Sequence, residues 1–203
     1  SGNAIDIDNG NLYIELSGAF GGIAGVNAFC FMRASFFNAT GGSLSIPFTD
    51  STTERANSTN RNGESAVLTV SNAFAIPALT RRIEVDLFAV GGLLYSGPTN
   101  AWADNLSARL ITASGRYTPQ TGANLIDNGT FESAAILNPA AARGWRVQRG
   151  TFQAQPYGLP NLPTPAVAST IGGGTYLARP TAVSSGSAAM TQTFKLNNLE
   201  TMV

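Results

Sequence analysis

The chain has 203 residues, and its 12 basic and 12 acidic side chains give a formal net charge of zero. So neutral a composition offers no basic surface for a nucleic-acid backbone, and no segment approaches the roughly 20 apolar residues of a membrane-spanning helix. The chain has no histidine, which removes the most frequent general base and transition-metal ligand. We therefore expect neither nucleic-acid binding nor membrane insertion.

Five stretches alternate apolar and other residues with period two, which is typical of β-strands. They are residues 11–16, 28–37, 67–70, 82–87 and 106–111. Turn-forming pairs lie between them, namely Asn9-Gly10, Gly21-Gly22, Gly41-Gly42, Asn62-Gly63 and Gly91-Gly92. Strands separated by such turns predict an all-β protein built as an antiparallel β-sandwich.

Three further stretches have the composition of connections. Residues 49–64 are polar, which predicts a long surface loop, and residues 113–123 have the composition of an inter-domain linker. Residues 154–165 contain four prolines, which exclude a central strand and predict an extended loop over a sheet edge.

The residues after the linker carry a family resemblance. Asn-Leu-Ile-Asp-Asn-Gly-Thr-Phe-Glu at 124–132, Gly-Trp at 144–145 and Gln-Thr-Phe at 192–194 resemble the opening half of the galactose-binding-like jelly rolls. This group includes many carbohydrate-binding modules. Residues 4–6, 16–22 and 101–107 resemble the closing half of the same fold. The resemblance implies a jelly roll in circularly permuted order, with parts at 1–112 and 124–203 joined by the linker 113–123.

Three arrangements would accommodate this order. The two parts of one chain can pack together as a closed permutant. The rear part of one copy can instead complete the front part of its neighbour by strand complementation. Alternatively, the chain is one repeat of a longer tandem protein. In the last two arrangements, which we favour jointly, Val203 of one copy lies near Ser1 of the next, and residues 189–203 followed by 1–10 read as strand, loop, strand.

The resemblance also implies a calcium site. In the resembling modules, calcium lies where the Asn-Gly-x-Phe-Glu stretch meets the aspartate of the last strand. The matching ligands here would be Glu132 and Asp104, with backbone oxygens near Asn128 and Thr130. Calcium prefers such oxygen ligands. Asp127 is a further acidic candidate at this site. The alternative is that Asp127 and Asp104 only form hydrogen bonds, at a turn and at the end of a strand.

Two aromatic residues are candidates for an interface. Phe29 and Phe31 lie on the strand face opposite Cys30 and Met32. If Cys30 and Met32 face the core, both phenylalanines point outward, and adjacent exposed aromatic residues mark an interface between copies. The alternative is that loops cover both sheet faces. We expect Cys30 to be a small core residue rather than a reactive thiol.

Four segments match the N-glycosylation pattern Asn-x-Ser/Thr, and they begin at Asn38, Asn57, Asn105 and Asn128. Asn105 and Asn128 fall within the motifs of the resembling family, where a structural role is expected. Asn38 and Asn57 lie in predicted loops.

Catalysis has little support, because acids are sparse, histidine is absent and no nucleophile elbow or phosphate loop is present. We expect a non-enzymatic structural subunit of an extracellular or cell-surface filament or tandem-repeat fibre. Its partners would be identical copies of itself. The alternative is a secreted carbohydrate-binding module that binds a polysaccharide.

Overall fold

We analysed a computed structural model of the chain, which describes residues 2–45, 56–91, 101–112, 124–127, 129–131, 145–156, 176–182 and 187–196. These residues form one short helix and ten strands, which follow one another in this order: α1 (Gly2–Asp8), β1 (Leu12–Gly22), β2 (Phe29–Phe37), β3 (Ser43–Ser45), β4 (Ala66–Ala75), β5 (Arg82–Val90), β6 (Ala101–Thr112), β7 (Arg146–Arg149), β8 (Thr151–Pro156), β9 (Tyr176–Ala182) and β10 (Ser187–Lys195). No helix among them is long and apolar enough to cross a membrane.

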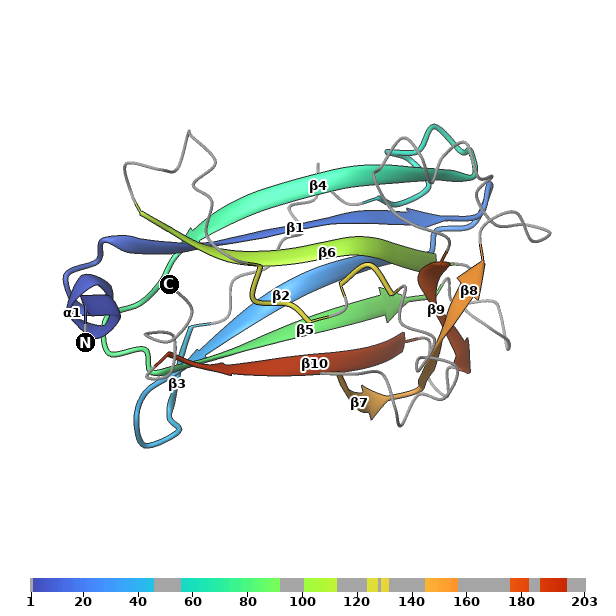
Figure 1. Cartoon of the computed structure of the whole chain (residues 1–203). Helices are drawn as coiled ribbons and strands as arrows, with labels where there is room; N and C mark the ends of the chain where they lie inside the picture. Colours follow the sequence, from blue (N-terminus) through green and yellow to red (C-terminus); the bar gives the residue numbers. More distant parts are fainter. Residues whose placement is uncertain are drawn as a thin grey trace.

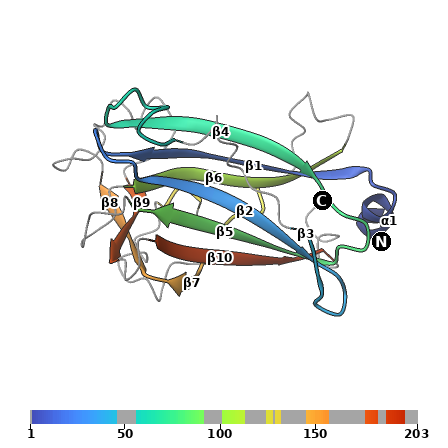
Figure 2. The ribbon, with the colours of Figure 1, turned by 180° about the vertical axis from the view of Figure 1, so that it is seen from behind.

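The strands form two five-stranded antiparallel sheets. One sheet, sheet A, has the order β4-β1-β6-β9-β8, and the other, sheet B, has the order β3-β2-β5-β10-β7. In Figures 1 and 2 the long strands of the two sheets lie in two layers, with α1 at one end and β8 and β9 at the other. The predicted all-β sandwich architecture is confirmed.

The core lies between the two layers and follows the predicted alternation. Ile14 and Leu16 of β1 are buried in it, as are Met32 of β2 and Val85 and Leu87 of β5. Their neighbours in sequence point to the outer faces of the sheets. Each of the five predicted strands is present, as β1, β2, β4, β5 and β6.

Two local predictions were wrong. Gly21 and Gly22 do not form a turn but end β1, because both approach other atoms so closely that no side chain fits. A Cβ on Gly21 would lie 2.1 Å from Nε1 of Trp102, and one on Gly22 would lie 2.6 Å from the carbonyl oxygen of Ala28. The start of the chain is not extended. Residues 2–8 form α1, which buries Ile7 in the core and ends at Gly10 with a left-handed φ of 72°.

Both parts of the chain contribute to both sheets. In sheet B, β10 from the rear part lies between β5 from the front part and β7, and it pairs with β5 from Ser187 to Lys195. In sheet A, β9 pairs with β6 at Ala103. Rear residues such as Phe152 and Met190 are buried in the common core. Within the single chain, the described residues of the two parts therefore pack together, and the residues of the linker lie outside the described residues.

The first and last described elements meet at one end of the molecule through Arg81. Its guanidinium forms an ion pair with Asp8 at the end of α1, with Nη2 2.7 Å from Oδ2. Its carbonyl oxygen accepts a hydrogen bond from the amide of Leu196, just after β10. Helix α1 and the residue that follows β10 thus lie at the same end of the molecule.

Candidate interaction surfaces and calcium site

The outer face of sheet B carries a group of aromatic side chains. Phe31 of β2 lies directly opposite Phe88 of β5 in the strand register, and their rings stack with centroids 5.1 Å apart. Phe29 extends this group, with its ring centroid 6.2 Å from that of Phe31. Cys30 and Met32 face the core, as predicted. The prediction that both phenylalanines are exposed was only partly right, because Phe29 is 9% exposed and Phe31 is half-buried.

Charged side chains continue this face along the same strands. The guanidinium of Arg33 lies over the ring of Phe88 at 4.5 Å and donates a 2.6 Å hydrogen bond to the carboxylate of Asp86. Asp86 is almost fully buried and also accepts a short hydrogen bond from the hydroxyl of Thr191 on β10. The face thus combines a stacked aromatic pair with a paired arginine and aspartate, and its polar groups connect strands of both parts.

A second set of contacts joins the two parts at the motif that carries the family resemblance. The amide of Leu106 on β6 donates to the carbonyl oxygen of Gly129 at 2.9 Å. A Cβ on Gly129 would lie 2.2 Å from the carbonyl oxygen of Leu106, so this close approach requires glycine. From the other side, the buried side chain of Gln192 on β10 pairs with the backbone of Asp127. Residues 124–127 and 129–131 therefore connect β6 of sheet A with β10 of sheet B.

Two of the four predicted calcium ligands lie within the described residues. Asp104 is buried on β6, and its Oδ1 accepts a hydrogen bond from the amide of Asn105 at 2.6 Å. Thr130 directly follows Gly129, whose carbonyl oxygen is bonded to the amide of Leu106. The stretch that contains Thr130 therefore contacts β6, the strand that carries Asp104. Glu132 and Asn128 lie outside the described residues. The carboxylate, hydroxyl and backbone oxygens at this junction are of the class that calcium prefers.

No group of three or more possible metal-binding side chains occurs within the part of the chain that the structure describes. A calcium site would therefore need Asp104 together with Glu132 and Asn128, which lie outside the described residues. Calcium binding stays a prediction. The buried thiol of Cys30 is not a candidate ligand, because burial raises its pKa and keeps it protonated.

Arg61 is an important residue that the sequence analysis missed. It lies in the polar loop before β4, yet it is 2% exposed. Its guanidinium donates to five backbone carbonyl oxygens, those of Ile23, Val26, Ala28, Ala56 and Glu64. These bonds fasten the loop to the β1–β2 connection. No motif marks this role, because an arginine in a loop rich in Ser, Thr and Asn is typical of a solvated surface.

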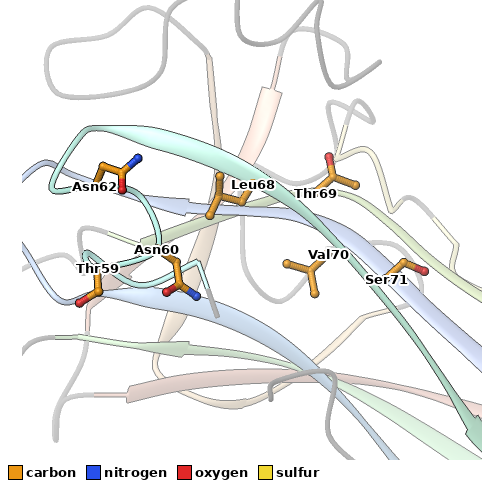
Figure 3. Close-up of a pocket in the computed structure, with 7 residues that line it drawn as sticks. All are labelled: Thr59, Asn60, Asn62, Leu68, Thr69, Val70 and Ser71. Carbon is orange, nitrogen blue, oxygen red and sulfur yellow. The ribbon is translucent and has the colours of Figure 1, made fainter. Parts of the chain in front are cut away.

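The loop held by Arg61 forms one wall of a surface cleft of about 650 Å³. Strand β4 forms the other wall, with Leu68 and Val70 pointing into the space and Thr59 and Asn60 opposite them (Figure 3). Among the described residues, the lining side chains are all uncharged. The described part of the cleft therefore presents hydroxyl and amide groups beside an aliphatic floor, and none of these groups is suited to acid–base catalysis.

Comparisons with protein-family models, with curated proteins and with solved structures find no match to this chain. The arrangement of the strands defines the class, which is an all-β protein with two antiparallel sheets.

Proposed function

We propose that this chain is a structural unit of an extracellular filament or tandem array. The unit is a jelly-roll-like sandwich in permuted order, and the rear part of one copy completes the front part of the next. The observation that carries this proposal is the position of β10. A rear strand lies inside sheet B, paired along its whole length with β5 of the front part.

Exchange between copies would preserve these contacts. The contacts between the two parts do not depend on whether the parts belong to one chain or to two. These contacts are the β5–β10 ladder, the bonds of Gln192 to Asp127 and the bond of Leu106 to Gly129. The linker of residues 113–123 reaches roughly 35 Å when it is extended, which is enough to pass to a neighbouring molecule. Open-ended exchange of this kind produces a filament from identical units.

The aromatic face of sheet B would supply a second contact between copies. Phe31 and Phe88 present a half-buried stacked pair on the outer side of the sheet. Stacked rings gain stability when a partner surface removes them from water. Arg33 lies beside the pair and would orient the partner by hydrogen bonds, while the buried Asp86 holds the guanidinium in place.

A secreted carbohydrate-binding module is the second candidate. It is favoured by the same face, because an aromatic ring beside a partly exposed arginine can stack on a sugar ring and bind its hydroxyl groups. It is also favoured by the closure of both sheets within one chain. Retention of the protein on an insoluble polysaccharide, lost in Phe88→Ala and kept in Phe74→Ala on the core side of β4, would support this candidate.

Electron microscopy and sedimentation of the purified full chain test the proposal. A structural unit of this kind forms filaments or large particles whose abundance rises with protein concentration. Discrete particles of a single 21.1 kDa chain at every concentration would contradict it. Phe88→Ala should weaken lateral contacts between filaments without preventing the exchange of β10.

A further inference from the structure

We infer that Asn38 is an N-glycosylation acceptor, an inference that rests on the proposed extracellular location. Asn38-Ala39-Thr40 lies in the connection between β2 and β3, at a tip of sheet B. Ala39, Thr40, Gly41 and Gly42 are exposed, and Asn38 is half-buried. A transferase acting on the folded tip would therefore find the whole recognition segment at the surface.

The side chain of Asn38 is held in one orientation. Its Oδ1 accepts hydrogen bonds from the hydroxyl of Thr40 at 2.8 Å, from the amide of Thr40 at 3.0 Å and from the amide of Gly42 at 2.8 Å. These three donors occupy the oxygen and leave the nitrogen Nδ2 without a hydrogen-bond partner among the described residues. The atom that must receive the sugar is thus the one that the hydrogen bonds of the turn do not occupy.

There is room for a sugar beside this nitrogen. A surface hollow of about 490 Å³ is lined by residues 38–41 and by Arg81, Arg82 and Lys195. Arg81 and Arg82 are already paired with Asp8 and Glu84. The first sugar attached to Asn38 can therefore lie over this hollow without displacing a core residue.

The other matching segments lack this combination. Asn57 is half-buried, and its Oδ1 accepts a hydrogen bond from the amide of Asn60 at 2.9 Å, one residue past the threonine of its own motif, Thr59. Oδ1 of Asn38, in contrast, is bonded to the threonine of its motif, Thr40. Asn105 lies within strand β6, and its own backbone has a positive φ of 50°. Asn128 lies outside the described residues. The structure therefore favours Asn38 over Asn57 and Asn105.

The modification needs a donor of stated chemistry, an oligosaccharide linked to a polyprenyl pyrophosphate. A bond forms between Nδ2 of Asn38 and the anomeric carbon of the first sugar. The bond from that carbon to the pyrophosphate oxygen breaks, and the lipid pyrophosphate leaves with the electron pair. The amide loses one proton to a base of the transferase. No oxidant or reductant is consumed.

The test is secretion of the full chain from a eukaryotic cell, followed by intact mass measurement before and after treatment with peptide-N-glycosidase. We expect a glycan whose removal converts Asn38 to aspartate, as located by peptide mapping. Thr40→Ala should abolish the modification, because it removes the hydroxyl that bonds to Oδ1, and Thr40→Ser should retain it. Asn57→Gln is the matched control and should leave the glycan unchanged.

An unmodified Asn38 in the secreted protein would overturn the inference, as would occupancy at Asn57 or Asn105 equal to or above that at Asn38. These results are separate from the fate of the proposed function. A secreted protein that forms filaments but carries no glycan at Asn38 contradicts this inference alone. A glycosylated protein that stays a single chain at every concentration contradicts the filament alone.

Discussion

The side chain of Gln192 pairs with the backbone of Asp127 through two hydrogen bonds. The amide of Asp127 donates to Oε1 of Gln192 at 3.1 Å, and Nε2 of Gln192 donates to the carbonyl oxygen of Asp127 at 2.8 Å. Gln192 is 4% exposed. The buried carboxamide of Gln192 thus pairs with both the amide and the carbonyl oxygen of Asp127, which lies outside the strands. These bonds hold the segment that contains Asp127 against β10.

Gln192→Ala should destabilise the protein by about 2 kcal/mol, because two part-buried hydrogen bonds and the packing of a buried side chain are lost. Urea denaturation followed by tryptophan fluorescence measures the change. Thr193→Ala, at the exposed neighbouring position on β10, is the control and should change stability by less than about 0.5 kcal/mol. Equal effects of the two substitutions would show that Gln192 has no special role.

Arg61→Lys should destabilise the protein by about 3 kcal/mol even though the charge is kept. An ammonium group has three donors and cannot reach all five carbonyl oxygens that the guanidinium contacts, so several would stay buried without a partner. Arg146→Lys, at an exposed position, is the matched control. Thermal denaturation compares them, and a similar Tm for both variants would contradict the role given to Arg61.

The ion pair of Asp8 and Arg81 predicts a small pH dependence of stability. The hydrogen bonds from Arg81 and from the amide of Leu79 hold the pKa of Asp8 below its ordinary value of 3.8. The stabilisation is therefore fully present above about pH 5 and is lost as the pH falls through the pKa of the folded state.

Asp8→Asn should remove this dependence. The wild-type protein should be more stable than the variant at pH 7, and the difference should shrink toward zero below about pH 3. Urea titrations of both proteins at a series of pH values measure the difference. A difference that stays constant down to pH 2 would show that the carboxylate of Asp8 contributes nothing through its charge.

Calcium should stabilise the protein if Asp104 and the stretch around Thr130 bind it. An ion at 100 times its dissociation constant adds about 2.7 kcal/mol to the free energy of unfolding. We expect a higher Tm in calcium than in a chelator and the loss of this difference in Asp104→Asn. Glu64→Gln is the control, since Glu64 is exposed and is not among the candidate ligands. An identical Tm with calcium and with chelator would refute the site.

The strands could be predicted because their alternation reflects burial on one side of a sheet. Ile14 and Leu16 on β1 and Val85 and Leu87 on β5 have the pattern that the core requires. The helix α1 could not be predicted this way, because its seven residues are too few to show a helical period and only Ile7 among the described side chains is buried. The one local indication of this helix is Gly10, which follows its end, but an Asn-Gly pair is equally typical of a turn between strands.

Contacts between distant segments were harder to predict than strands. The resemblance led us to expect the stretch around Thr130 beside Asp104, but it did not specify the hydrogen bond between Gly129 and Leu106. The pairing of Gln192 with Asp127 depends on a side chain placed by the register of β10 with β5. Arg61 is buried because five carbonyl oxygens from three segments converge on it, and convergence of backbone groups leaves no trace in the local sequence.

The exchange of β10 between copies is the central claim, and a disulfide across its ladder tests it most directly. Glu84 of β5 and Thr193 of β10 lie opposite each other, and opposite residues of antiparallel strands have Cα atoms roughly 4.5–5.5 Å apart, which suits a disulfide. The double variant Glu84→Cys/Thr193→Cys is made in a Cys30→Ala background. Ser35→Cys/Glu84→Cys is the matched control, because Ser35 and Glu84 pair within the front part.

After oxidation of the assembled protein, non-reducing electrophoresis under denaturing conditions separates the products. Exchange predicts a ladder of covalent multimers for the β5–β10 pair and a single chain for the control. A single chain for both variants would contradict the account, because it would show that β10 completes only the sheet of its own molecule.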